Sequence, residues 1–392
     1  GALTFAPLLH AQWHGFTPTD LVFPSFLFAM GNAMSFVLPK WDKLSNATFL
    51  FKITKRTLLI FLLGFLMYWF PFTGPLSETR ILGVLQRIAL CYGIAAIIAH
   101  YMHERVMMVL AAVLLLSYWY ISMHYGVAGD PLSITGNVGI QFDKWLMGDH
   151  HMYQGEGFAF DPEGWISTLP AIVNVLIGYR VGILVQENGK TYEGLTQLLM
   201  WGAGFVFLAF MWNYQFPINK KLWTSSFVVL TVGLDMIILA TIIYRIELQN
   251  QLQFSRFFEV FGKNPLVIYL FSELLLSGLY IIQIGNQSCF EWIYTHSFAH
   301  LPSYWASLGF AVSYMLVCWL LGYILNKYRL KSKLDIDKLA YKLSTDVEYL
   351  IALEKGNYQV FKTLNQAIPI IRKLSYVLGL RYESLVELYN RE

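Results

Sequence analysis

The feature that most constrains this chain is a series of nine mostly apolar stretches within residues 1–326. About 20 apolar residues are needed for one helix to cross the hydrocarbon core of a bilayer. Because backbone groups in lipid must be paired within the protein, helices are favoured over open sheets. The sequence therefore predicts an all-α, polytopic membrane bundle. Its predicted spans are 21–39, 53–72, 84–100, 106–124, 165–186, 195–212, 224–246, 264–284 and 304–326.

The composition excludes an ordinary soluble domain. Hydrophobic residues make up 56% of the chain and charged residues only 14%, whereas soluble domains carry about 25% charged residues. The net charge of +3 is too small to favour nucleic acid as a partner. We expect membrane lipids to surround the protein, and a homodimer is compatible with the sequence.

The C-terminal part of the chain differs in composition. Residues 327–392 hold 12 of the 28 Lys and Arg residues but no Trp, Met or Cys. We therefore expect a membrane domain over residues 1–330 and a small soluble helical tail over 331–392, either native or an engineered addition. In this tail, a run of helix N-cap residues at 344–346 precedes a predicted helix.

The distribution of Lys and Arg between alternate loops predicts the orientation of the spans. One set of loops and the start of the tail carry 14 of these residues, and the other set carries 4. Because cytoplasmic loops hold the excess of positive charge, the tail is expected in the cytoplasm. Residues 1–20 are then expected in the periplasm of a bacterial inner membrane. An odd number of spans also predicts one more helix upstream, ten in total.

Five polar clusters lie at or beside the predicted spans, where ionisable side chains are costly and suggest function. They are residues 10–20, 80–87, 161–165, 220–226 and 262–265. The predicted topology places the first four in one outer layer and the last on the cytoplasmic side. Scattered structural polar residues need not share a layer, so this coincidence predicts a site that faces the periplasm. The long acidic loop 125–164 is either part of that site or, in its first half, a solvated connector.

The first cluster contains two histidines, His10 and His14, which are candidates for proton transfer because histidine titrates near neutral pH. A metal site is the alternative, but no clear third ligand accompanies the pair, so no metal is expected. Asp20 could equally serve the start of the helix that follows it.

The other clusters leave similar alternatives open. Arg87 needs a partner, which could be an acid of another helix, such as Asp20 or Glu163, or an anionic group of a ligand. Lys220 and Lys221 stand on the outer side and at a helix N-terminus, two unfavourable places for a cation, which suggests an anionic partner.

Together, the clusters resemble the heparan-alpha-glucosaminide N-acetyltransferase family, whose bacterial members are linked to N-acetylglucosamine use. The matching motifs are HAQWHGFTPTDLVFP at 10–24, GVLQR at 83–87, DPEG at 161–164, KLWTSS at 221–226 and GKNP at 262–265. The resemblance covers most of residues 1–326. It implies an enzyme that moves an acetyl group from cytoplasmic acetyl-CoA to the amine of a glucosamine-type sugar on the periplasmic side.

The resemblance also implies roles for individual residues. The active-site histidine of the family matches His10, which would be a general base or a transient acetyl carrier. Asp20 or Glu163 would orient His10 or hold the ammonium group of the sugar. The residues expected to bind CoA are Gln86, Arg87, Lys221, Lys263 and Asn264. Those expected to contact the sugar are Trp13, His14, Asp161 and Trp223.

Two other functions fit the residues. A permease for an amino sugar or a muropeptide fragment would also place polar groups among membrane helices, although the chain lacks a detectable internal repeat of the kind many transporters have. A membrane anchor for the C-terminal tail would leave the clusters at 10–20 and 80–87 unexplained.

Overall fold

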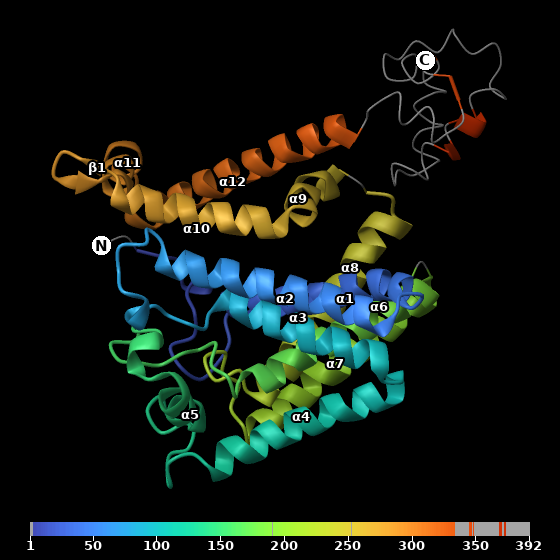
Figure 1. The fold of residues 1–392 in the computed structure, drawn as a ribbon, viewed down its shortest axis with the longest axis horizontal. Helices are drawn as coiled ribbons and strands as arrows, with labels where there is room; N and C mark the ends of the chain where they lie inside the picture. The colour runs from blue at the N-terminus through green and yellow to red at the C-terminus, as the bar shows by residue number, and fades with distance from the viewer. Residues whose placement is uncertain are drawn as a thin grey trace. The chain divides into compact units, whose positions relative to one another are not determined.

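The computed structural model describes residues 3–189, 191–251 and 253–333, together with the isolated positions 345, 346, 348, 368–370, 372 and 373. The chain divides into two compact units, one formed by residues 1–256 and 270–312 and the other by 257–269 and 313–392. Most of the described part is helical (Figure 1). The helices expected in the tail fall on residues that the structure does not describe, apart from those isolated positions.

The protein is a multi-pass membrane bundle, and each of the nine predicted stretches falls on a helix. The helices on these stretches are α1 (Val22–Val37), α2 (Asn46–Trp69), α3 (Val84–Tyr101), α4 (Glu104–His124), α6 (Thr168–Asn188), α7 (Tyr192–Asn213), α8 (Ser225–Ile243), α10 (Pro265–Ile281) and α12 (Ser303–Lys333). The shorter helices are α5 (Val138–Met147), α9 (Gln253–Lys263) and α11 (Cys289–Ser297), and the strands β1 (Gln283–Ile284) and β2 (Gln287–Ser288) form one hairpin.

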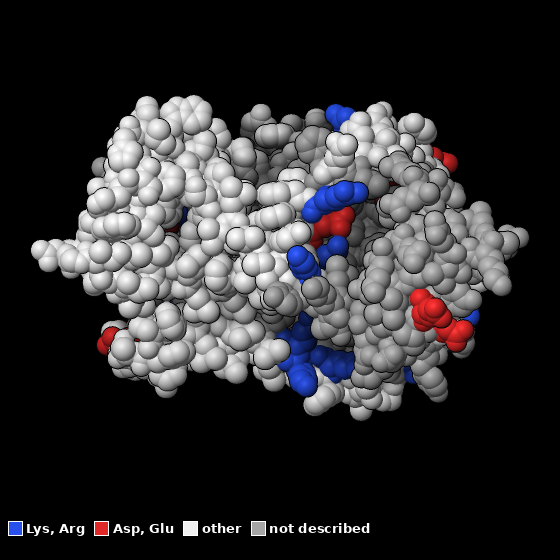
Figure 2. Space-filling model, turned by 90° about the horizontal axis from the view of Figure 1, so that it is seen from above, with Lys and Arg blue, Asp and Glu red and all other residues white. Residues whose placement is uncertain are grey.

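Within the described part of the chain, fewer than nine helices are long and apolar enough to cross a membrane. Among the described residues, seven helices are long and apolar enough, or eight if α9 and α10, which meet at a bend of 81°, are counted as one span. The remaining stretch, α2, is 24 residues long but carries three basic residues, Lys52, Lys55 and Arg56, in its first half. Figure 2 shows one face of the molecule, where charged side chains gather near the middle and leave much of the described surface uncharged.

Close backbone contacts bind α6 to α1. A Cβ atom added at Gly31 of α1 would lie 2.0 Å from the carbonyl oxygen of Val175, and one added at Gly178 of α6 would lie 2.2 Å from that of Phe28. Small residues allow membrane helices to approach this closely. As a result α6 is the most buried of the candidate spans, and it forms a rigid base for the polar residues near its N-terminus.

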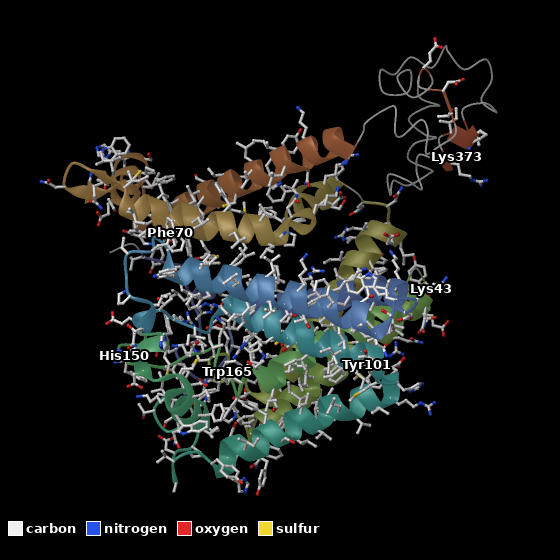
Figure 3. All side chains as sticks on the ribbon, in the orientation of Figure 1. Lys43, Phe70, Tyr101, His150, Trp165 and Lys373 are labelled. Atoms are coloured by element: carbon white, nitrogen blue, oxygen red, sulfur yellow. The ribbon has the colours of Figure 1, made fainter. Side chains whose placement is uncertain are left out.

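The first unit has two ends. Phe70, His150 and Trp165 lie toward one end in Figure 3, and Lys43 and Tyr101 lie toward the other. We call the first the pocket end; it gathers the loops around residues 3–20, 70–83, 125–167 and 214–224. The basic loop after α1 therefore lies at the opposite end from the four clusters that were expected to share one layer.

The long loop at 125–164 is folded rather than a solvated connector. It contains α5 and a 3₁₀ turn, Asp149–His151. Its buried side chains Ile140, Met152 and Phe160 form a small apolar cluster against which Trp13 packs. Because this cluster ties the loop to the N-terminal segment, the loop becomes one wall of the pocket end.

Candidate active site

The N-terminal segment brings His10 against Asp20. The His10 Nδ1 atom lies 2.6 Å from the Asp20 Oδ1 atom. Thr17 begins a 3₁₀ turn, Pro18–Leu21, and its backbone N–H and side-chain hydroxyl both donate to the second oxygen of Asp20, at 2.9 and 3.0 Å. The Asp20 side chain is buried, whereas that of His10 is 49% exposed. The turn therefore fixes the carboxylate, and the carboxylate fixes the imidazole.

This arrangement determines which nitrogen of His10 is available. A carboxylate only accepts hydrogen bonds, so the proton of a neutral imidazole belongs on Nδ1 and the Nε2 atom keeps its lone pair. The Lys220 Nζ atom lies 3.3 Å from Nε2 and 3.4 Å from Nδ1. His10 thus combines an unprotonated Nε2 atom that faces the Lys220 ammonium with a carboxylate that orients the ring.

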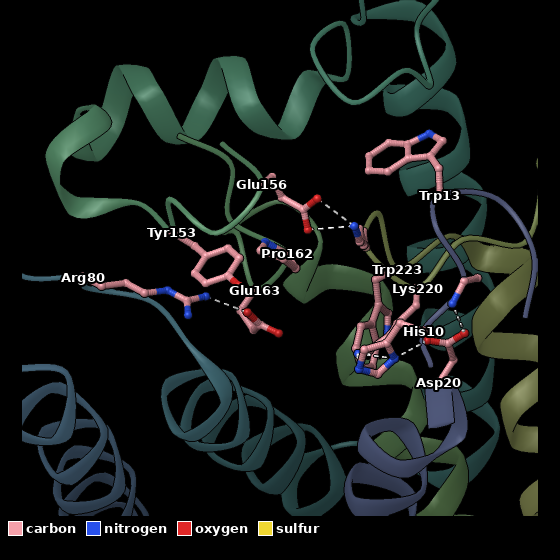
Figure 4. A pocket seen from close by; sticks show the side chains of 12 residues that line it. His10, Trp13, Asp20, Arg80, Tyr153, Glu156, Pro162, Glu163, Lys220 and Trp223 are labelled. Carbon is pink, nitrogen blue, oxygen red and sulfur yellow. Dashed lines mark hydrogen bonds and ion pairs between the residues drawn. The ribbon is translucent and has the colours of Figure 1, made fainter. Parts of the chain in front are cut away.

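A pocket of about 250 Å³ opens in front of His10 (Figure 4). Six of the residues expected in the site line it, namely His10, Trp13, Asp20, Glu163, Lys221 and Trp223. The other lining residues are Ala11, Arg80, Tyr153, Glu156, Pro162 and Lys220. The pocket therefore joins segments that are far apart in the sequence.

Arg80 is the main cation of one wall, and the sequence had not assigned it to the site. Its Nη2 atom lies 2.7 Å from an oxygen of Asp161 and 2.7 Å from an oxygen of Glu163. The rings of Tyr68 and Tyr153 lie 4.9 and 4.7 Å from its guanidinium carbon. Two acids were proposed to orient His10. Asp20 contacts His10, whereas Glu163 contacts Arg80 instead.

The opposite wall holds two adjacent lysines with different surroundings. The Lys221 Nζ atom lies 2.7 Å from Glu156, an acid of the folded loop. Lys220 has no carboxylate partner among the described residues; its contact is His10. Burial lowers the pKa of Lys220, with the nearby acids Glu163 and Asp20 acting in the opposite direction.

Trp223 forms the floor of the pocket and separates it from Arg87. Its backbone has a positive φ of 55°, a left-handed conformation that is uncommon for a large side chain. The indole N–H donates to the Asn174 side chain at 3.1 Å, and the Arg87 guanidinium lies 4.9 Å from the ring centre. The strained turn therefore inserts the indole between the pocket and the interior of the bundle.

Arg87 does not form an ion pair with Asp20 or Glu163, which was one of the two alternatives for its partner. Its Nη2 atom donates to the Gly164 carbonyl at 3.1 Å and to the hydroxyl of Ser167. The Nε and Nη1 atoms of Arg87 are buried without a partner, as are both side-chain polar atoms of Gln86. Unsatisfied buried donors and acceptors are rare in native proteins, so this pair of residues offers groups that a ligand could satisfy.

Besides Gln86 and Arg87, four expected site residues lie outside the pocket lining. His14 contacts the Asn219 side chain at 3.3 Å, and burial lowers the pKa of His14. Asp161 is held by Arg80. Lys263 pairs with Glu259, four residues earlier, at 2.9 Å. Asn264 donates to Asn326 at 2.6 Å.

The structure adds one acid that the sequence did not single out. Asp143 of α5 is 1% exposed and accepts a hydrogen bond from the backbone N–H of Trp165 at 3.1 Å. Burial raises the pKa of Asp143 to about 7. The only sequence signal was its place in the acidic loop. Within the described residues, no group of three or more His, Cys, Asp or Glu could hold a metal ion.

Comparison with known proteins finds two relatives that share one name. No family model matches the chain. The heparan-alpha-glucosaminide N-acetyltransferases of Mus musculus and Homo sapiens are each 28% identical to it, over 324 and 323 residues. The aligned region covers 68% of this chain and 49% and 48% of those relatives. The chain thus spans about half the length of the curated relatives it matches.

Proposed function

The chain is a homologue of the heparan-alpha-glucosaminide N-acetyltransferases, and on that premise we propose that it is a membrane-embedded acetyltransferase. Its donor would be acetyl-CoA and its acceptor the amine of a glucosamine-type sugar. The observation that carries the proposal is the 2.6 Å contact between His10 and Asp20 at the mouth of a pocket. A base oriented by a carboxylate beside a cavity is what acyl transfer to an amine requires.

The reaction needs a base because the amine of an amino sugar is protonated near neutral pH and an ammonium group cannot attack. The Nε2 atom of His10 would take a proton from the ammonium group, and the lone pair of the resulting amine would then form a bond to the acetyl carbon. The carbon–sulfur bond then breaks, and the CoA thiolate receives the second proton that the nitrogen loses as it becomes an amide. Alternatively, Nε2 itself attacks the acetyl carbon and passes the group to the amine in a second step. Asp20 serves both routes because it holds the tautomer with a free Nε2.

Supporting features for the acceptor are the aromatic and acidic walls of the pocket. Trp13 and Tyr153 offer flat apolar surfaces of the kind that pack against sugar rings, and Glu156 and Glu163 supply negative charge. We propose that the sugar enters here from the periplasmic side. The orientation rests on the bias of Lys and Arg between the loops.

Supporting features for the donor lie behind Trp223. The unpartnered polar atoms of Gln86 and Arg87 are suited to the amide and carbonyl groups of an acetyl-CoA arm that reaches through the bundle from the cytoplasm. Of the cations expected to bind CoA, Lys221 lines the pocket, where it pairs with Glu156. Lys263 and Asn264 are the weaker candidates, because they lie outside the pocket lining and contact Glu259 and Asn326.

The direct test is acetyl transfer by the purified protein in proteoliposomes. With labelled acetyl-CoA and glucosamine, we expect N-acetylglucosamine to form, and we expect the His10→Asn variant to form almost none. The matched control is His14→Asn, which changes a neighbouring histidine outside the pocket lining. Uptake of labelled glucosamine in the absence of acetyl-CoA, with no acetylated product, would replace this proposal by the permease.

A further inference from the structure

The charges of the pocket are paired, with one exception. Asp20 pairs with His10, Glu163 with Arg80, and Glu156 with Lys221. Lys220 also lines the pocket, but no carboxylate contacts it among the described residues. One positive charge therefore remains without an anionic partner beside the reactive imidazole.

The position of Lys220 is fixed by its turn. The Trp223 backbone N–H donates to the Lys220 carbonyl at 3.0 Å, and the Leu222 N–H donates to the Asn219 side chain at 2.9 Å. Asn219 is fully buried, and Trp223 is locked below the pocket by Asn174. A side chain that rises from a fixed turn keeps its charge in place before the substrate arrives.

An unpaired cation in this place is unfavourable in the resting protein. Burial removes water from the ammonium group and lowers the pKa of Lys220. A nearby negative charge would offset that cost. The Nζ atom lies 3.3 Å from His10 Nε2. A negative charge that pairs with Lys220 would therefore lie at the reacting atoms of the substrate rather than at a distant part of a ligand.

We propose that Lys220 is a catalytic residue that stabilises the oxyanion formed from the acetyl carbonyl during transfer. The inference rests on the proposed acetyltransferase function. When a nitrogen, from the sugar or from His10, bonds to the carbonyl carbon, the π electron pair moves onto the oxygen. When the carbon–sulfur bond breaks, the pair returns and CoA leaves as the thiolate.

The oxygen carries its full negative charge only between these two events. A cation that waits there binds the intermediate more strongly than the neutral thioester, and this difference is what lowers the barrier. The same cation is useful whether His10 acts as a base or as an acetyl carrier, because both routes pass through an oxyanion.

The experiment compares Lys220→Met, Lys220→Arg and the matched control Lys144→Met, in which the lost lysine pairs with Asp149 in the loop at the same end. The acceptor is plain glucosamine, which has no anionic group that Lys220 could bind. We expect Lys220→Met to lower kcat by about 10²–10³-fold, as loss of an oxyanion donor does, with KM for glucosamine changed less than about threefold. Lys220→Arg should recover part of kcat, and Lys144→Met should keep the wild-type value.

A second measurement separates catalysis from binding. The affinity for a ketone analogue of acetyl-CoA, in which a methylene replaces the thioester sulfur, should be equal in Lys220→Met and wild type. The thermal unfolding midpoint of Lys220→Met should be no lower than that of wild type, because the variant loses an unpaired, partly buried charge. If kcat is retained, or if it falls only in parallel with the affinity for the analogue, Lys220 is not an oxyanion residue. A wild-type protein without transferase activity would instead refute the proposed function, and the inference with it.

Discussion

The pocket and the segment at 262–265 both drew attention as polar residues beside an apolar helix, yet they satisfy their polar groups in different ways. In the pocket, Arg80 meets acids 81 and 83 residues away, and His10 meets Lys220. In the other segment, Lys263 meets Glu259 one helical turn earlier, and both side chains are about half exposed. An exposed pair of this kind needs no ligand to explain it, whereas the convergence of distant charges around a cavity does.

The largest expected effect that tests this comparison is at His10. His10→Ala should lower the rate of acetyl transfer by about 10²–10⁴-fold, the usual cost of losing a general base, and by more if His10 carries the acetyl group. Affinity for acetyl-CoA should stay within a few-fold. His14→Ala, which changes a residue outside the pocket lining, should be mild. An inactive His14→Ala beside an active His10→Ala would move the reactive group out of this pocket.

Asp20→Asn should have the next largest effect. An asparagine retains an oxygen for the Thr17 backbone, so the turn should remain folded, but it no longer favours the tautomer of His10 with a free Nε2. We expect a rate loss of at least about tenfold, smaller than that of His10→Ala. Turnover and thermal unfolding measured together distinguish this from a loss of fold. Wild-type turnover in Asp20→Asn would show that His10 needs no orienting carboxylate.

A pH-dependent effect on stability is expected at Asp143. Burial raises the pKa of Asp143 to about 7, whereas an aspartate in an unfolded chain has a pKa of about 3.9. The folded protein therefore holds a proton that the unfolded chain releases, and this residue makes the free energy of unfolding fall as pH rises from about 4 to 7.

Asp143→Asn keeps an oxygen that accepts from the Trp165 backbone and removes the titration. The variant should raise the unfolding midpoint more at pH 8 than at pH 5, by several degrees, as measured by thermal unfolding in detergent. Asp149→Asn, in an exposed ion pair of the same loop, is the control. Equal shifts at the two pH values would contradict the buried acid as the cause.

The smallest effect is expected at Lys263, which belongs to the segment at 262–265 that contrasts with the pocket. An exposed ion pair one helical turn apart contributes about 0.3–0.5 kcal/mol. Lys263→Ala should therefore change the unfolding midpoint by about a degree and KM for acetyl-CoA by less than about threefold. A large rise in that KM would place Lys263 in the CoA site, as the family resemblance implied.

Much of the fold follows from local properties of the sequence. The hydropathy of a stretch depends only on its own residues. Because backbone groups in lipid must pair within the protein, every long apolar stretch is expected to form a helix. The distribution of Lys and Arg between the loops is also a local property, and from it we predicted which loops share one end of the first unit. The sequence also indicated a set of neighbouring site residues, because side chains confined to one thin layer of a helical bundle lie close to one another. These residues are His10, Asp20, Glu163, Lys221 and Trp223.

Only the tertiary structure decided which of these groups touch. Arg80, rather than Arg87, pairs with the acids Asp161 and Glu163, because Arg80 lies in the loop before α3 and Arg87 lies in the first turn of α3, behind Trp223. Lys220, rather than Lys221, reaches His10, because the turn that ends at Trp223 directs two adjacent side chains to different partners. Such directions depend on backbone conformation and on the packing of distant helices, and a local pattern of residue types contains neither.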